Sequence, residues 1–372
     1  MKKLNIAILT EIIDYHSGAR APLELAKYLA KRGHKISIYG YPLGKDENVR
    51  HDLKANNVQV LLFKKSNPIS LFKKIRRDKP QVIIFAGTLP SFLAVKLTGV
   101  PIIQMYMGTQ FNALLEYRIP HQNIPYYIKV LNYITNLYIF LVGSIIFRLS
   151  TSVVAISKYA AYEGKRLYRK NVSEVIYLGT TILPRIIRNE TIEKTVDLSL
   201  LAVSRITPYK GFHLIVEALK RVKTKKKIHL NIVGSQIKQN YVDYLKKIGG
   251  KNIDIIIDPT DQKLANLYQN SDIYVTADRY LYFGLPIVEA AQFSKPTISF
   301  NFAAASELIE HGKTGFITET SEEFSRYIKI LAQDYKLREQ LGKQAKIRSQ
   351  QFSWDACSKR WEDVLRKFVE NE

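Results

Sequence analysis

The sequence predicts an α/β protein built from two Rossmann-like, doubly wound domains. Its 372 residues are too many for one ordinary hydrophobic core and suit two domains. Short β-rich runs alternate with helical stretches in the first half, and the same alternation starts again after a polar stretch at 181–197. Strands separated by helices are typical of a parallel sheet. Two such patterns in succession predict two parallel sheets, and we place the linker at 181–197.

The first half supplies the elements of the first sheet. An apolar run at 4–10 is the expected first strand. A helix is expected over 22–31, because Pro22 stands at its start and Gly33 just past its end. Further strands are expected at 35–41, 58–63, 81–86, 101–105 and 152–156. These elements assign residues 1–182 to a first domain.

The second half repeats this organisation. The expected strands are 198–203, 228–233, 253–257, 273–276, 296–300 and 315–318. From residue 321 onward the chain is charged and periodic, so we expect mostly helix, with a last helix near 354–369. We place the second domain at 183–351 and a C-terminal helical segment at 352–372.

The charge balance of the chain is strongly basic. Its 56 Lys and Arg exceed its 33 Asp and Glu, which gives a formal net charge of +23. Such a surplus draws a protein toward nucleic acid, anionic lipid head groups or phosphorylated substrates. Zinc-finger spacing, an RNP aromatic pair and a heptad-linked basic region are all missing, so we do not expect a nucleic-acid partner. The alternative is a generally cationic surface with no specific partner.

The cysteine count and the first residues bear on the compartment. Cys357 is the single cysteine, which excludes an intramolecular disulfide and disfavours a cysteine-based metal cluster. The apolar run near the start ends at Glu11, which is too short for a signal-peptide h-region. Both features fit a reducing cytoplasm, and we expect a cytoplasmic protein.

An uncharged stretch of 18 residues at 130–147 stands apart from the βα pattern. It lies between Lys129 and Arg148, and its length permits a membrane span. The next strand must return to the soluble sheet, however, so a single crossing is not expected. Two interpretations remain open: a buried helix of the first domain, or a helix lying in the membrane interface. Basic residues at 73–79 and 158–170 would add electrostatic attraction, which predicts peripheral attachment at the inner face of the cell membrane.

The segment 204–212 carries the strongest local motif. The apolar run at 198–203 leads into a loop with two fixed cations, Arg205 and Lys210, and a helix opens near Phe212. Cations at a strand end beside a helix N-terminus form a site for a diphosphate. The alternative is that both are solvated loop charges. A metal ion could neutralise a diphosphate as well, but the chain has no Asp-x-Asp sequence to hold it, so no metal site is expected.

A second motif lies at 282–290. A Gly-Leu-Pro turn at 284–286 is expected to start a helix whose first turn carries Glu289, a carboxylate suited to paired sugar hydroxyls. Gly284 has no Cβ, so the backbone can approach a phosphate closely. The alternative role for Glu289 is a favourable contact with the helix dipole. Phosphate and sugar contacts together predict a pocket for a nucleotide sugar.

These two segments resemble the C-terminal half of glycosyltransferase family 4, whose members are retaining enzymes. The resemblance implies the glycosyltransferase-B (GT-B) fold, with two Rossmann-like domains facing a central cleft and a last helix that crosses back to the first domain. Arg205 and Lys210 match the basic pair that stabilises the departing diphosphate. Glu289 matches the second Glu of the E-x7-E motif, which holds the ribose.

The same resemblance assigns further residues. Phe283, Gly284 and Leu285 match the turn whose amides face the phosphates, Gly234 matches a glycine near the nucleotide, and Asp258 and Pro259 fall where the family holds the base. Ala303 and Ala304 stand where the family has a Gly-Gly pair. In the first half, Gly18 lies in the expected phosphate-facing loop, and His16, Met107 and Thr109 are the acceptor-side candidates.

Two positions depart from the family pattern. Leu281 replaces the first Glu of E-x7-E, and Met107 replaces a histidine beside the donor sugar. Asp278 or Arg279 could reach into a pocket altered in this way. The resemblance implies retaining transfer of a sugar from a nucleoside diphosphate to a hydroxyl of a glycan or lipid-linked acceptor, without a cofactor. The alternative is a non-catalytic partner subunit that keeps the fold and binds nucleotide.

Overall fold

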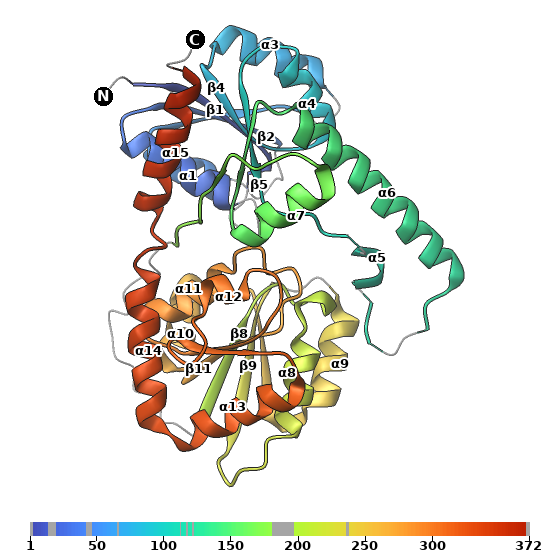
Figure 1. Cartoon of the computed structure of the whole chain (residues 1–372), viewed down its shortest axis with the longest axis vertical. Helices are drawn as coiled ribbons and strands as arrows, with labels where there is room; N and C mark the ends of the chain where they lie inside the picture. The colour runs from blue at the N-terminus through green and yellow to red at the C-terminus, as the bar shows by residue number, and fades with distance from the viewer. Residues whose placement is uncertain are drawn as a thin grey trace. The chain divides into compact units, whose positions relative to one another are not determined.

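The computed structural model describes residues 3–13, 20–41, 47–64, 67–111, 113–116, 118–120, 123–180, 197–235 and 238–369. Its two parallel sheets confirm the predicted α/β fold class (Figure 1). The chain divides into two compact units. The first contains Met1–Thr109, Asn136–Gly179 and Ser353–Glu372, and the second contains Gln110–Thr135 and Thr180–Phe352. The predicted linker lies outside the described residues except for Asp197, and the sequence-based domain boundaries stay predictions.

The sheet of the first unit has seven parallel strands in the order β3-β2-β1-β4-β5-β6-β7. The strands are β1 (Asn5–Ile12), β2 (Lys35–Tyr41), β3 (Val58–Leu62), β4 (Val82–Ala86), β5 (Ile102–Tyr106), β6 (Ser152–Ala155) and β7 (Glu174–Val175). The chain moves outward from β1 to β3 and then returns to place β4 beside β1. The direction of winding therefore reverses between β1 and β4, as in a doubly wound fold.

Helices cover this sheet. Those of the first unit are α1 (Arg20–Lys31), α2 (Glu47–Ala55), α3 (Pro68–Asp78), α4 (Leu89–Lys96), α7 (Lys158–Tyr168) and α15 (Trp354–Val369). The start of α3 illustrates the local signals: the Asn67 side chain accepts a hydrogen bond from the Ser70 amide at 2.9 Å, and Pro68 fits the first helical position. In the core below it, strand residues such as Ile83 pack with Leu71 of α3 and Phe92 of α4.

The sheet of the second unit has six parallel strands in the order β10-β9-β8-β11-β12-β13. They are β8 (Leu198–Val203), β9 (Ile228–Gly234), β10 (Ile253–Ile257), β11 (Ile273–Thr276), β12 (Thr297–Phe300) and β13 (Gly315–Thr318). Here the winding reverses between β8 and β11.

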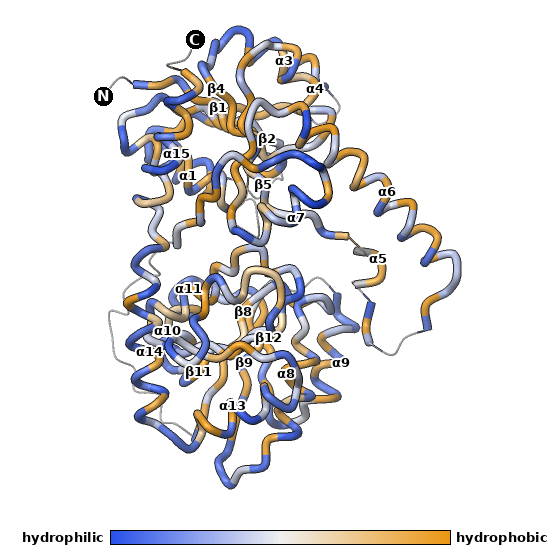
Figure 2. The backbone as a smooth tube through the Cα atoms, in the orientation of Figure 1, coloured by the Kyte–Doolittle hydropathy of each residue, from blue (hydrophilic) through white to orange (hydrophobic). Residues whose placement is uncertain are grey.

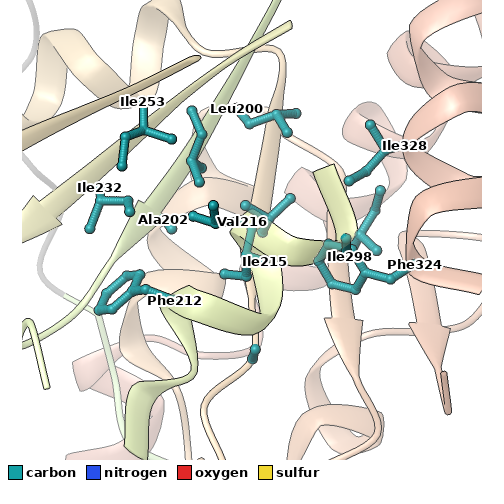
Figure 3. Close-up of a cluster of buried hydrophobic side chains, with 14 of the residues drawn as sticks. Leu200, Ala202, Phe212, Ile215, Val216, Ile232, Ile253, Ile298, Phe324 and Ile328 are labelled. Atoms are coloured by element: carbon teal, nitrogen blue, oxygen red, sulfur yellow. The ribbon is translucent and has the colours of Figure 1, made fainter. Parts of the chain in front are cut away.

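The helical elements of the second unit lie between and after these strands, except α5, which precedes β8 in the chain. They are α5 (Ala113–Glu116), η2 (Pro208–Lys210), α8 (Phe212–Lys220), α9 (Gln239–Gly249), η3 (Gly250–Asn252), α10 (Asp261–Asn270), α11 (Leu285–Gln292), α12 (Ala305–Leu308), α13 (Ser321–Gln333) and α14 (Tyr335–Ser349). Contacts join α8 to α9 and α13, and α11 to α14. Figure 3 shows the core beneath α8, where Ile215 and Phe324 meet strand residues such as Leu200 and Ile298. Burial of these apolar side chains fixes the strand ends that carry the candidate site.

Helix α6 (Tyr126–Leu149) contains the uncharged stretch at 130–147. It begins among residues of the second unit and ends among those of the first. In the described part of the chain it is the one helix long and apolar enough to cross a membrane, yet only 17% of its apolar window is buried. In Figure 2 orange stretches of hydrophobic residues alternate with white and blue ones along α6. The buried-helix interpretation is therefore wrong, because most of this apolar surface is exposed.

Candidate functional site

The candidate site lies at the carboxyl ends of β8 and β11. These strands are neighbours in the second sheet, with Ile273 paired to Leu200, and they flank the point where the winding reverses. The loop after β8 carries Arg205 and Lys210, and the loop after β11 leads to α11. Open α/β sheets bind ligands at this kind of switch point, because the loops on either side part there.

A glycine brings the two loops together. After β8 the chain forms the short helix η2 and then passes Gly211, which has a φ of 72°. A Cβ atom at this position would lie 2.3 Å from the carbonyl oxygen of Ala277, just after β11. The absence of a Cβ therefore allows the close approach of the loop after β8 to the end of β11. The Arg279 amide also donates to the Tyr209 carbonyl at 3.4 Å.

The Arg205 side chain is positioned by Tyr209. Its Nη2 donates to the Tyr209 hydroxyl at 2.6 Å, and its guanidinium carbon lies 5.9 Å from the centroid of that ring. Tyr209 is buried, while Arg205 is half-buried. A guanidinium presents five N–H donors in a rigid fork, so fixing one nitrogen sets the direction of the others. Arg205 is thus held at the strand end rather than extended as a solvated loop charge.

The Lys210 ammonium pairs with Asp278. Its Nζ lies 2.5 Å from Asp278 Oδ2, and the two side chains are 13% and 8% exposed. The other carboxylate oxygen of Asp278 accepts from the Tyr280 amide at 3.0 Å. Of the two residues that the sequence suggested could reach into the pocket, Asp278 contacts Lys210 of the basic pair directly. A positive charge is therefore held at the switch point by an internal carboxylate.

Glu289 lies further along helix α11 than the sequence predicts. Helix α11 begins at Leu285 and has no acidic residue in its first turn, so the prediction of Glu289 in that turn is wrong. The reason is that Gly284, with a φ of 89°, is the N-cap, which leaves Glu289 in the second turn. Glu289 is 5% exposed, and its Oε2 accepts from the Tyr268 hydroxyl at 2.9 Å.

Tyr268, the hydrogen-bond partner of Glu289, is itself held in place by a neighbouring ring. Tyr268, from α10, stacks on Phe293 with ring centroids 5.5 Å apart. The sequence carries no local signal for this role, because α10 and α11 are separated by β11. Tyr268 therefore positions the carboxylate and is a site residue that sequence reasoning missed.

Gly234, Asp258 and Pro259 lie at the same edge of the sheet as the basic pair. Gly234 ends β9 and pairs with Ile257 at the end of β10, and the Asp258 amide donates to the Gly234 carbonyl at 3.1 Å. A Cβ on Gly234 would lie 1.8 Å from the Ser204 carbonyl oxygen, next to Arg205. The structure thus brings these predicted donor-side residues together with the loop after β8.

The residues around Leu281 form the floor of the turn before α11. Leu281 is 5% exposed, and its Cδ1 lies 2.8 Å from where a Cβ on Gly284 would stand. Its carbonyl accepts from the Ala304 amide at 2.9 Å. Phe283 is buried edge-on against Phe352, with centroids 5.6 Å apart. Leu281 therefore packs against Gly284 and fills the space that a Cβ at that position would need.

The acceptor-side candidates belong to the first unit. His16 and Gly18 lie outside the described residues. Met107 follows β5 and is half-buried, and Thr109 is buried two residues later.

Thr109 belongs to a polar network at the end of β5. Its hydroxyl lies 2.7 Å from the hydroxyls of both Tyr106 and Tyr168, and its amide donates to Glu163 at 2.9 Å. Burial, reinforced by the Glu163 charge, raises the pKa of Tyr106 well above its ordinary value. This network fixes the loop that follows β5. Sequence reasoning did not identify Glu163 and Tyr168, because α7 lies far from this loop in the chain. Tyr106, at the end of β5, was also missed, because its hydroxyl meets Thr109 and Glu163 only in the folded chain.

Two family models match the chain, one over each half. Residues 18–182 match a model described as Glycosyltransferase Family 4, and residues 185–348 match one described as Glycosyl transferases group 1. The capsular polysaccharide biosynthesis glycosyltransferase CapM of Staphylococcus aureus is 27% identical over 176 residues, which are 44% of this chain and 46% of CapM.

A second relative has a similar identity and coverage. A probable sucrose-phosphate synthase of Thermosipho melanesiensis is 26% identical over 182 residues, 46% of this chain and 41% of that protein. The chain spans about half the length of the curated relatives it matches.

Solved structures share the fold over the whole chain. A glycosyltransferase from Rickettsia africae superposes with a TM-score of 0.76 at 21% identity, covering 100% of both chains. Anabaena HepE in complex with UDP and glucose also gives 0.76, at 19% identity, covering 98% of this chain and 100% of HepE. These likenesses establish the two-domain GT-B fold that the sequence predicts.

Proposed function

The chain belongs to the glycosyltransferases, with a family 4 domain followed by a group 1 domain, and we propose that it transfers a sugar from a nucleoside diphosphate to a hydroxyl group. The acceptor is a glycan or a lipid-linked saccharide, and the configuration at the anomeric carbon is retained. One observation carries this proposal: Arg205 and Lys210 are held at the switch point of the second sheet, after the carboxyl end of β8.

The basic pair acts on the leaving group. Negative charge develops on the diphosphate as its bond to the anomeric carbon breaks, so cations already in place there lower the barrier. The fork of Arg205 suits two phosphate oxygens, and Lys210 adds a compact charge. Fixed cations of this kind do the work for which other enzymes use a metal ion, and we include the absence of a metal requirement in the proposal.

Glu289 and the turn before α11 hold the rest of the donor. The Glu289 carboxylate, oriented by Tyr268, accepts hydrogen bonds from the ribose hydroxyls. Gly284 and Leu285 supply backbone amides at a helix N-terminus, where an anion is favoured. Gly234, Asp258 and Pro259 line the nucleoside end. Structures of similar fold have been solved with UDP, including HepE, which makes uridine the first base to test.

Retention needs no protein nucleophile. A β-phosphate oxygen of the leaving group accepts the proton of the acceptor hydroxyl while the bond from the anomeric carbon to that phosphate breaks. The acceptor oxygen forms its new bond on the same face of the sugar. Replacement of the family histidine and glutamate by Met107 and Leu281 leaves this chemistry available. Gly18 remains a candidate for contact with the donor phosphate, and His16, Met107 and Thr109 are the candidates on the acceptor side.

The proposed place of action is the cytoplasmic face of the cell membrane, with peripheral attachment. The net charge of +23 supports an anionic surface as partner. A lipid-linked acceptor is held at the same surface, so attachment would raise the encounter rate between the enzyme and its acceptor.

The test is turnover of nucleotide sugars by the full chain. Arg205→Ala and Lys210→Ala should each lower kcat by about 10²- to 10³-fold, with a smaller rise in KM, because both act on the transition state. Lys220→Ala, which removes an exposed cation at the end of α8, is the matched control and should leave kcat unchanged. Unchanged kcat in both site variants would refute the leaving-group role. A wild-type chain that binds nucleotide but never turns over would instead identify a non-catalytic partner subunit.

A further inference from the structure

Helix α6 exposes a continuous apolar face. Its 24 residues span about 36 Å at 1.5 Å per residue. The exposed apolar side chains recur at three- and four-residue spacing, which places most of them on one side of the helix. They are Tyr126, Tyr127, Val130, Leu131, Tyr133, Ile134, Leu137, Tyr138, Leu141, Ile145 and Leu149. A soluble surface rarely carries so large a contiguous apolar patch without a partner.

Basic residues lie near both ends of this helix, with Lys129 close to its start and Arg148 close to its end. Helix α7 packs beside the end of α6, where Arg148 Nε donates to the Tyr168 carbonyl at 3.0 Å. Between residues 123 and 170 the chain has seven Lys and Arg and a single acidic residue, Glu163. That carboxylate accepts from Tyr106 and from the Thr109 amide, at 2.8 and 2.9 Å. The helix is therefore positively charged at its two ends, most strongly at the end beside α7.

The ends of α6 argue against a membrane span. Strands β5 and β6, which precede and follow this region, pair side by side in one sheet, with Ile103 opposite Ser152. Ile119, between β5 and α6, is buried in the core of the second unit. A crossing by α6 would require the preceding segment to cross the bilayer as well, and that segment is packed into a folded core.

We propose that α6 lies in the plane of an anionic bilayer, with its exposed apolar face inserted among the acyl chains and the cations of α6 and α7 on the lipid phosphates. An apolar face with cations at both ends and tyrosines along it is the pattern of an interfacial helix. A second copy of the chain would bring the same positive charges face to face, which disfavours self-association through this surface. The inference deepens the proposed membrane location and is independent of the proposed transfer reaction.

Vesicle binding by the full chain tests this inference. The wild-type chain should sediment with vesicles of phosphatidylcholine mixed with phosphatidylglycerol and bind phosphatidylcholine alone more weakly. Leu137→Glu and Leu141→Glu should each weaken binding to the mixed vesicles by about tenfold, because each removes one leucine side chain that the bilayer would bury. Ile347→Glu, at an exposed apolar residue of α14, is the matched control and should bind as wild type does.

Tryptophan fluorescence gives an independent measurement of whether α6 enters the bilayer. In Tyr138→Trp, the new indole should shift its emission to the blue on the mixed vesicles, whereas the native Trp354 and Trp361 are buried and should not respond. Binding of the glutamate variants equal to wild type, or no vesicle binding at all, would overturn the inference. A wild-type dimer that the glutamate variants convert to monomer would overturn it in favour of a protein interface. Transfer to a soluble acceptor should be the same in all these variants, so a failure of the catalytic proposal would be seen separately.

Discussion

Replacement of Asp278 by asparagine is expected to strengthen the binding of a nucleoside diphosphate. In the structure the Asp278 carboxylate holds the Lys210 ammonium at 2.5 Å, at the place proposed for the donor phosphates. A diphosphate must therefore compete with Asp278 for this cation, and its charge is repelled by the same carboxylate. Asparagine keeps an oxygen acceptor for the Tyr280 amide, removes the negative charge, and places an NH2 donor where Oδ2 accepts from Lys210, so the ammonium is released for the ligand.

The geometry sets the size of the effect. At an effective dielectric constant of about 20, unit charges this close attract by roughly 7 kcal/mol, before the desolvation that offsets most of it. If about 1 to 2 kcal/mol of that attraction is transferred to the ligand, Kd should fall by about 5- to 30-fold.

Titration calorimetry with uridine diphosphate measures this Kd directly for the full chain. Asp243→Asn, which removes an exposed carboxylate from α9, is the control for a general change in net charge and should alter Kd little. Thermal unfolding of each variant checks that the fold is kept. A Kd for Asp278→Asn equal to or higher than that of wild type would refute the competition, because a purely structural role predicts weaker binding.

Two further predictions concern stability. Gly234→Ala should lower the free energy of unfolding by about 2 to 4 kcal/mol, because the added Cβ would meet the Ser204 carbonyl. The control is Gly250→Ala, at a positive φ in open space, which should lower it by only about 1 kcal/mol. Equal losses in urea titrations of the two variants would argue against the close approach at Gly234. Burial lowers the pKa of His34 below its ordinary value of 6.5 despite the neighbouring Glu362, so the unfolded chain binds more protons and the free energy of unfolding should fall as the pH drops below 6.5. Urea unfolding above and below this pH measures the slope, which His34→Gln should reduce; a slope of opposite sign would contradict the burial argument.

The positions of the strands follow from local patterns in the sequence. Apolar runs of four to eight residues between helices are fully buried strands, and their predicted positions agree with β8, β10, β11 and β13. Strand β7 escaped prediction because it has only two residues, Glu174 and Val175, at the sheet edge. The exposure of α6 could not be predicted either, since an apolar helix has the same composition whether protein or lipid covers it.

The candidate site was predictable where it depends on neighbours in the chain. Arg205 and Lys210 sit in a loop directly after a strand, so their position at a sheet edge follows from the pattern. The pairing of Lys210 with Asp278 depends instead on β8 and β11 lying side by side, which is a property of the folded sheet. The same holds for Tyr268 and Glu289, which reach each other from two helices. Contacts of this kind leave no periodic trace in the sequence.

The most direct test of the proposed diphosphate site compares uridine diphosphate with uridine as ligands of the full chain. If Arg205 and Lys210 bind the diphosphate, the wild-type protein should bind uridine diphosphate at least about a hundredfold more tightly than uridine, and the double variant Arg205→Ala, Lys210→Ala should lose most of that difference. Equal affinity of the wild type for both ligands, or full discrimination retained by the double variant, would contradict the assignment of these two residues.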